Sequence, residues 1–89
     1  MPGMKLELYT SAFCGPCHAA RAVVADARAL VPALEVDEAD VAARPDQAEA
    51  RDIRSTPTIV VTRDDGEVVF RAAGVPSLDK LLGAMALAV

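Results

Sequence analysis

Hydrophobic and polar residues alternate along residues 4–9, and this two-residue period predicts a β-strand. From Cys14 to about Val31 the apolar positions recur instead every three or four residues, which is the period of an amphipathic helix. The positions with this spacing are Cys17, Ala20, Val24, Ala27 and Val31. Pro32 lies where this helix must end, because a proline cannot continue its hydrogen-bonded turns.

The middle of the chain predicts a second strand and a short helix. The strand begins at Leu34 and extends to Val41, and a helix then runs from Pro45 to Arg51. This helix is rich in alanine and polar on one face. Two strands joined by a helix are typical of a parallel pair, because the helix returns the chain to the end of the sheet where the first strand began.

The last third of the chain predicts a hairpin and a final helix. β-branched residues along 58–62 predict a third strand, the Arg-Asp-Asp-Gly segment at 63–66 predicts a tight turn, and residues 68–72 form the antiparallel partner. Ser77 is a preferred residue for a helix N-cap. The helix that follows it has four apolar residues on its expected inner face, namely Leu78, Leu81, Leu82 and Met85.

These elements follow the order β-α-β-α-β-β-α, which is an α/β arrangement. We expect a four-stranded mixed sheet flanked by helices on both faces, in a single domain over residues 1–89. In such sheets, binding and catalytic sites form at the carboxyl ends of strands. Cys14 follows the first strand directly and therefore lies where a site is expected.

Composition and charge argue against several classes of partner. The net charge of −4 argues against nucleic acid, whose binding requires clustered lysine and arginine. No apolar run reaches the roughly 20 residues of a membrane span. The first residues enter a strand without the basic and apolar stretches of a leader peptide. We therefore expect a cytoplasmic protein that binds neither nucleic acid nor a membrane.

The segment Cys14-Gly15-Pro16-Cys17 contains the only two cysteines and joins the first strand to the long helix. With Cys14 at the helix start, Cys17 lies one turn further on, where the two sulfurs can reach disulfide distance. Unpaired N–H groups and the positive end of the helix dipole stabilise a thiolate at Cys14. Pro16 fits a first helical turn, and Gly15 leaves room for another protein's disulfide to approach. The motif therefore predicts dithiol–disulfide exchange.

Three other uses of the cysteine pair compete with exchange. Zinc sites require four ligands, and beyond the cysteines the chain offers only His18 and carboxylates. The segment from Cys14 to His18 also has the C-x-x-C-H spacing of haem attachment, with Met85 as the candidate second ligand. A purely structural disulfide would close too short a loop to add much stability. We expect no metal and no cofactor apart from a redox-active disulfide between Cys14 and Cys17.

The chain resembles the thioredoxin superfamily through motifs that together span nearly its whole length. They are the cysteine motif, the Ile-Arg-Ser-Thr-Pro-Thr segment at 53–58, the Asp65-Gly66 hairpin and Gly74. The Cys-Gly-Pro-Cys motif resembles that of thioredoxins proper, whereas the Leu-Tyr-Thr-Ser segment at 8–11 resembles glutaredoxins. The chain is thus similar to the small, glutaredoxin-sized thioredoxins of some prokaryotes.

The resemblance implies roles for residues far from the cysteines. Pro57 would be a cis-proline facing the disulfide, and the backbone N–H and C=O of Thr56 would pair with an extended target segment. Gly74 would leave the floor of the binding groove open. On the residues alone, Pro57 is more simply a strand-entry proline, because cis bonds are rare, and Gly74 is equally well explained as a turn glycine. With Gly15 and Pro16, these three residues make up the expected substrate-binding surface.

Several positions depart from the family pattern. Thioredoxins proper have a buried acid six residues before the first cysteine, where Leu8 stands, and a paired lysine that aligns here with Val36. Phe13 replaces the tryptophan before the motif. Ser11 stands in the place of a glutaredoxin lysine, and residues 74–77 do not match the segment with which glutaredoxins bind glutathione.

The resemblance implies a monomeric thiol–disulfide oxidoreductase that reduces protein disulfides. Cys14 would attack the target and the more buried Cys17 would resolve the mixed disulfide. The Gly-Pro spacer and the missing glutathione segment favour a thioredoxin-reductase-like flavoenzyme as the reductant. A glutathione-dependent, glutaredoxin-like reductase is the alternative, and a metal or haem carrier is a more distant one.

Overall fold

The computed structural model of the chain describes residues 3–88. Its elements follow the order predicted from the sequence, and their bounds agree with the prediction to within one residue at nearly every end. They are β1 (Lys5–Thr10), α1 (Gly15–Leu30), β2 (Glu35–Asp40), α2 (Pro45–Ala50), β3 (Thr58–Thr62), β4 (Val68–Ala73) and α3 (Leu78–Leu87).

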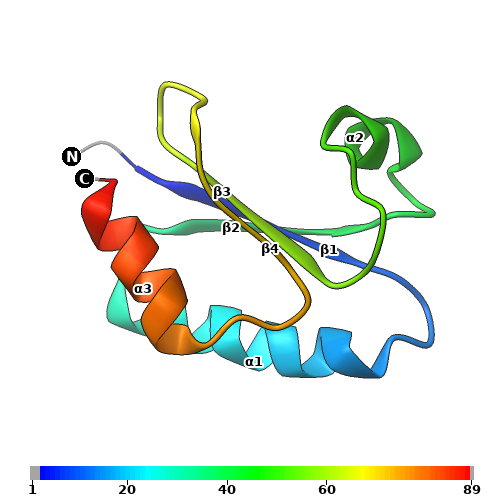
Figure 1. The fold of residues 1–89 in the computed structure, drawn as a ribbon, viewed down its shortest axis with the longest axis horizontal. Helices are drawn as coiled ribbons and strands as arrows, with labels where there is room; N and C mark the ends of the chain where they lie inside the picture. Colours follow the sequence, from blue (N-terminus) through cyan, green and yellow to red (C-terminus); the bar gives the residue numbers. More distant parts are fainter. Residues whose placement is uncertain (1–2, 89) are drawn as a thin grey trace.

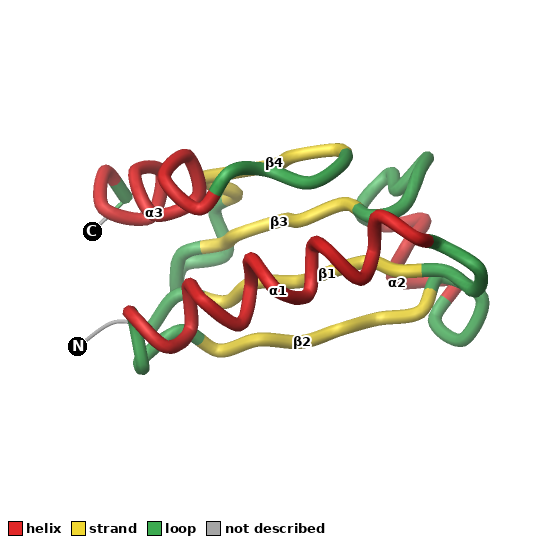
Figure 2. The backbone as a smooth tube through the Cα atoms, turned by 90° about the horizontal axis from the view of Figure 1, so that it is seen from below, coloured by secondary structure: helices red, strands yellow, loops and turns green. Residues whose placement is uncertain are grey.

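The four strands form one mixed sheet in the order β2-β1-β3-β4. β1 and β2 are parallel, whereas β3 pairs antiparallel with both β1 and β4. Helices α1 and α3 lie on one face of this sheet and α2 lies on the other (Figure 1). Figure 2 shows the molecule from the side that α1 covers. The predicted α/β fold with a four-stranded mixed sheet flanked by helices is therefore confirmed.

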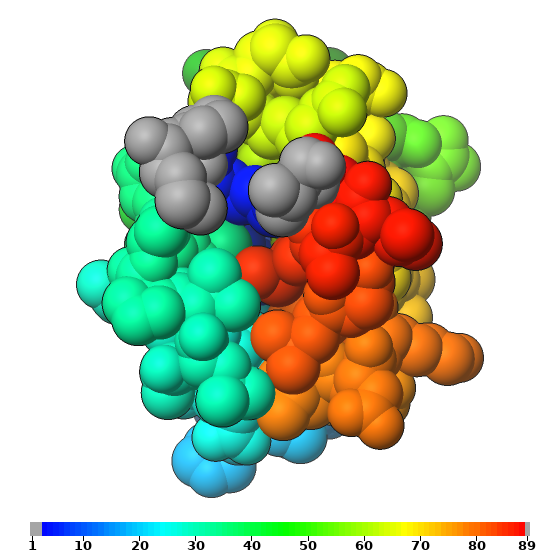
Figure 3. Space-filling view, turned by 90° about the vertical axis from the view of Figure 1, so that its left-hand side faces the viewer, coloured from blue at the N-terminus to red at the C-terminus, as the bar shows by residue number. Residues whose placement is uncertain are grey.

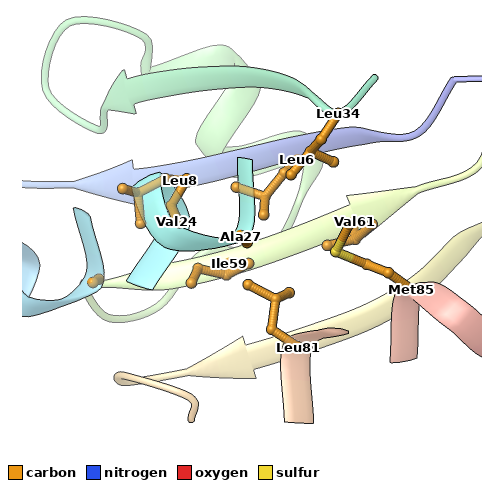
Figure 4. Close-up of a cluster of buried hydrophobic side chains, with 10 residues drawn as sticks. Leu6, Leu8, Val24, Ala27, Leu34, Ile59, Val61, Leu81 and Met85 are labelled. Atoms are coloured by element: carbon orange, nitrogen blue, oxygen red, sulfur yellow. The ribbon is translucent and has the colours of Figure 1, made fainter. Parts of the chain in front are cut away.

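The larger core lies between the sheet and the pair α1 and α3. Leu6 and Leu8 of β1 and Ile59 and Val61 of β3 point to the same side of the sheet, because residues two apart on a strand share a face. They pack against side chains of the two helices (Figure 4), with Leu81 of α3 fully buried. Other helical residues of this core are Ala20, Val24, Ala27 and Met85.

The helix α1 covers the sheet because its apolar stripe matches the helical period. Cys17, Ala20, Val24 and Ala27 are its buried residues, as the spacing predicts. The helix ends at Leu30, and Val31 is its C-cap.

At the end of the molecule remote from the cysteines, the 63–67 turn, the C-terminal part of α3 and the α1–β2 connection lie together (Figure 3).

The other face of β1 is buried as well. Tyr9, Ala39 and Val60 form a second, smaller core with Ala48 of α2. Glu7 lies on this same face and is only 5% exposed. The alternation that predicts β1 therefore separates two buried faces rather than a buried and a solvated one.

No helix of residues 3–88 is long and apolar enough to cross a membrane.

Candidate functional site

The two cysteines form a disulfide at the N-terminus of α1. Cys14 is the N-cap residue, with extended backbone angles, and Gly15 and Pro16 are the first two residues of the helix. Pro16 fits there because the first N–H groups of a helix have no partner within it. The Cα atoms of the cysteines are 5.3 Å apart, one helical turn along the chain. The positions predicted for the motif at the helix start are thus observed.

The two sulfurs differ in their surroundings. Cys17 is 1% exposed and belongs to the buried stripe of α1, whereas Cys14 is half-buried. The backbone N–H of Cys17 donates to Cys14 Sγ at 3.2 Å. A reduced Cys14 therefore has a backbone donor and the positive end of a helix dipole beside it, and both stabilise a thiolate. Cys14 is the sulfur within reach of another molecule.

A second part of the site lies directly before β3. The Thr56–Pro57 peptide bond is cis, as the resemblance implies. Pro57 is fully buried. Its carbonyl accepts a 2.8 Å hydrogen bond from the N–H of Gly74, which has a φ of 95° that glycine adopts without strain. On the other side, the Thr56 and Ser11 hydroxyls are 2.5 Å apart.

These contacts gather the expected site residues at one end of the sheet, where β1 ends and β3 begins (Figure 1). Thr56 contacts the loop that leads into the cysteine motif, and Gly74 contacts Pro57. Within Thr56, the backbone N–H and C=O make no hydrogen bond to any other backbone group in residues 3–88. The expected substrate-binding residues therefore lie on three neighbouring segments, with one backbone edge left unpaired.

Gly15 and Phe13 present opposite kinds of surface beside Cys14. A Cβ added at Gly15 would meet nothing within 4 Å, so this position opens to solvent. Phe13 is fully exposed at 107% and has a φ of 58°, an unusual backbone conformation for a bulky residue. The aromatic ring of this chain neighbour of Cys14 is thus held in solvent and makes no contribution to the core.

Among residues 3–88, the side chains considered as zinc or haem ligands do not come together at the cysteines. His18 is an exposed residue of the first turn of α1. Met85, the candidate second haem ligand, packs instead in the core beside Val61 (Figure 4), far along the sheet from the motif. Within residues 3–88, no three side chains of the histidine, cysteine or acidic types come together in a group that could hold a metal ion.

The side of the sheet below the motif corrects one expectation. Leu8 is buried, as its replacement of an acid suggests, but its partner on β2 is Glu38 and not Val36. Val36 lies opposite Leu6, two pairs earlier along the strands. Glu38 is exposed and makes a 2.9 Å ion pair with Arg21 of α1. The alignment placed the lysine position two residues too early, because no residue in β2 marks its register.

A polar network under α2 was not predicted at all. The buried Glu7 carboxylate accepts hydrogen bonds from the Tyr9 hydroxyl and from Arg51 Nε, both at 2.8 Å. Gln47 Nε2 donates to the Tyr9 hydroxyl at 3.2 Å. Burial raises the pKa of Tyr9, an effect the bond from Gln47 opposes. The network fixes α2 and the start of the 51–57 segment to β1. In the sequence, only the glutamate within the strand pattern could have indicated this network.

Comparison with known proteins agrees with this geometry. The sequence model of the thioredoxin family matches residues 4–86. The thioredoxin of Methanocaldococcus jannaschii is 36% identical over 86 residues, which are 96% of this chain and 95% of that protein. The thioredoxin of Chlamydia trachomatis is 29% identical over 80 residues, 90% of this chain and 78% of that one.

Solved thioredoxin structures share the fold. Thioredoxin-2 of a malaria parasite superposes with a TM-score of 0.88 at 13% identity, over 97% of this chain and 84% of that one. The oxidised mitochondrial thioredoxin 3 of Saccharomyces cerevisiae has a TM-score of 0.81 at 20% identity, over 93% and 77% of the two chains.

The chain belongs to the thioredoxin family. With its Cys14–Cys17 pair it is a thiol–disulfide oxidoreductase whose substrates are protein disulfides. The matches to thioredoxins do not favour the glutaredoxin-like alternative.

Proposed function

We propose that this protein works in the reducing direction, with Cys14 as the attacking sulfur and Cys17 as the resolving one. The inequality of the two sulfurs supports this most directly. Cys14 is the N-cap residue, is accessible and accepts the Cys17 N–H, whereas Cys17 is 1% exposed. A thiolate is the nucleophile in exchange, so the sulfur with the donors and the access attacks first.

The exchange then proceeds in two displacements. The Cys14 thiolate attacks one sulfur of the target disulfide, forming a Cys14–target bond and releasing the other target sulfur as a thiolate, which takes a proton. The Cys17 thiol loses its proton and attacks Cys14 Sγ, forming the Cys14–Cys17 disulfide and releasing the second target thiolate. Two electrons pass from the dithiol to the target, and no group other than the disulfide is needed as a cofactor.

The target is proposed to bind across the three segments around Cys14. Its backbone pairs with the free N–H and C=O of Thr56, as an added strand pairs with a sheet edge. Gly74 lies beside this edge, where its N–H is bonded to the carbonyl of the buried Pro57. Gly15 and Pro16 allow close approach to the disulfide, since both are exposed and Gly15 opens to empty space.

Phe13 is proposed as the apolar contact for the target. A fully exposed aromatic ring beside the reacting sulfur has its surface in water until a partner covers it. Burial of such a ring stabilises a complex through the hydrophobic effect without any specific sequence in the target. Together with backbone pairing at Thr56, this favours recognition of many different protein disulfides.

The proposed setting is the cytoplasm, where the protein acts as a monomer and a thioredoxin-reductase-like flavoenzyme restores the dithiol with electrons from NADPH. The test compares two complete reducing systems with insulin as the protein disulfide. One contains NADPH and a thioredoxin reductase, and the other contains NADPH, glutathione and glutathione reductase. We expect rapid insulin reduction with the first system and little above background with the second. Equal or faster reduction through glutathione would contradict the proposed reductant.

A further inference from the structure

Ser11 and Thr56 lie opposite one another in the continuation of the β1–β3 ladder. The last pair of that antiparallel ladder is Tyr9 with Thr58. Each step along one strand is a step back along the other, so the next pair is Thr10 with Pro57 and the one after is Ser11 with Thr56. The two hydroxyls, 2.5 Å apart, therefore form a cross-strand pair just beyond the end of the sheet.

Backbone hydrogen bonds cannot continue the sheet to this point. Pro57 has no N–H to donate, and its carbonyl is already bound by the N–H of Gly74. Among the hydrogen bonds of residues 3–88, the Ser11–Thr56 bond is the one that joins residues 11–13 to residues 53–57. Both residues are half-buried, so the bond is partly shielded from water. A side-chain bond thus takes over where the backbone pairing stops.

We propose that Ser11 is a positioning residue, whose hydroxyl holds Thr56 so that the backbone of Thr56 is ready to pair with a target segment. The proposal rests on the target-binding role of Thr56 given above. Thr56 combines two unpaired backbone groups with a side chain that is fixed to the motif loop, and in the 53–57 segment the second feature distinguishes it. Fixing this edge before binding lowers the entropy lost when a target strand is added.

The hydroxyl pair is expected to affect protein targets and not small disulfides. A small disulfide needs only Cys14, whereas an extended protein segment also needs the Thr56 edge. Neither hydroxyl contacts a cysteine sulfur in the described hydrogen bonds, so the chemistry at Cys14 does not require them. Removal of the pair should therefore raise KM for a protein disulfide and leave kcat near its original value.

The experiment measures steady-state reduction of insulin and of hydroxyethyl disulfide by the full chain. Ser11→Ala and Thr56→Val each remove one hydroxyl, and the valine keeps the β-branched shape of threonine. Ser11→Thr and Thr56→Ser keep the hydroxyls and should restore binding. Ser55→Ala is the matched control. Ser55 is an exposed neighbour, and its hydroxyl makes no hydrogen bond to another group of residues 3–88.

We expect KM for insulin to rise roughly two- to tenfold in Ser11→Ala and in Thr56→Val, which is the effect of one hydrogen bond. The double variant should be no worse than either single variant, because both remove the same bond. Rates with hydroxyethyl disulfide should not change in Ser11→Ala, and Ser55→Ala should match the original protein with both substrates. Ser11→Thr and Thr56→Ser should bring KM for insulin back toward its original value.

Three results would overturn the inference. They are an unchanged KM for insulin, an equal loss of rate with insulin and with hydroxyethyl disulfide, and a KM in the double variant raised by the product of the two single effects. Failure of the proposed function itself is distinguishable, since the unsubstituted protein would then not reduce insulin at all. Thermal melting of each variant separates lost target binding from lost folding, because a variant that folds normally and binds insulin poorly has lost only the positioned edge.

Discussion

The backbone N–H of Cys17 donates a hydrogen bond to Cys14 Sγ over 3.2 Å, while the Cys17 side chain itself is buried under α1. One residue of the pair therefore stabilises negative charge on the sulfur of the other. The arrangement follows from placing the first cysteine at the N-cap and the second one turn later, and it assigns different roles to two chemically identical side chains.

The two cysteine variants should consequently behave differently. Cys14→Ser is expected to abolish exchange, whereas Cys17→Ser should still attack targets and accumulate mixed disulfides that it cannot resolve. Non-reducing gels of a cell extract mixed with each variant, with reducing gels as the control, measure the trapped species. Equal trapping by both variants would show that attacker and resolver are assigned wrongly.

Gly15→Ala separates approach of the target from stability of the fold. The added Cβ meets nothing within 4 Å, and alanine is a better helix former, so the free energy of unfolding should stay the same or rise by up to about 1 kcal/mol. Insulin reduction should slow, because the methyl group lies where the target disulfide approaches Cys14. Urea unfolding and insulin kinetics measure the two effects. A variant with unchanged kinetics would mean that targets do not approach over Gly15.

Arg51→Met tests the buried network beneath α2. It removes a donor from Glu7, whose side chain is 7% exposed, and should lower the free energy of unfolding by about 2–3 kcal/mol. The matched control is Arg54→Met, because the Arg54–Asp52 pair is largely exposed and its loss should change stability by less than about 0.5 kcal/mol. Urea unfolding at neutral pH compares them. Similar losses in both variants would show that Glu7 does not depend on Arg51.

The sequence predicted the order of elements because each had its own local signal. Helix α1 had a regular apolar spacing and Pro32 after its end, and α3 had Ser77, whose hydroxyl accepts the Lys80 N–H at 3.2 Å. The cysteine motif located the first part of the site for the same local reason. Thr56 and Pro57 lie far from the motif in the chain, so their place in the site could be predicted only from the family resemblance.

Contacts between distant segments explain what the sequence did not reveal. Glu7 appears as a solvated position in an alternating strand, and only the covering helix α2 shows that it is buried with Arg51. The Ser11–Thr56 bond requires the register of β1 and β3, which the pattern does not fix. The position paired with Leu8 was expected at Val36 and is Glu38 for a related reason, because the acidic residues of β2 give no clear inner face.

The Asp37–Arg44 ion pair should make part of the stability depend on pH. The hydrogen bond from Arg44 holds the pKa of Asp37 below its ordinary value of 3.8. Because the pKa is lower in the folded state, this stability is complete above about pH 4 and is lost as the pH falls through the folded value. Asp37 is partly exposed, so the contribution should stay under about 1 kcal/mol.

Urea unfolding at pH 7 and at pH 3 measures the contribution of this pair. Asp37→Asn should be less stable than the original protein at pH 7, and the difference should shrink at pH 3. Asp46→Asn is the control, since Asp46 makes no described ion pair. A difference that stays constant over this range would contradict the assignment to Asp37.

Leu8→Asp should destabilise the protein strongly and in a pH-dependent way. Leu8 is 1% exposed in an apolar layer, and its partner Glu38 brings a second negative charge to the same pair of positions. Loss of the leucine packing and burial of a carboxyl group should together cost about 3–5 kcal/mol at pH 7. Arg21 offers little compensation, because it already pairs with Glu38 at 2.9 Å.

The sign of the pH effect identifies its cause. Burial and like charge both raise the pKa of the introduced carboxyl in the folded state, so its neutral form is the tolerated one. The stability of Leu8→Asp should therefore be greatest at about pH 4 and should fall as the pH rises toward 7, relative to Leu8→Asn at each pH. Adding Glu38→Gln to Leu8→Asp should recover part of the loss at pH 7 by removing the like charge. If Leu8→Asp and Leu8→Asn keep the same difference in stability from pH 4 to pH 7, the introduced carboxylate is solvated, and the layer beneath the disulfide is open to water.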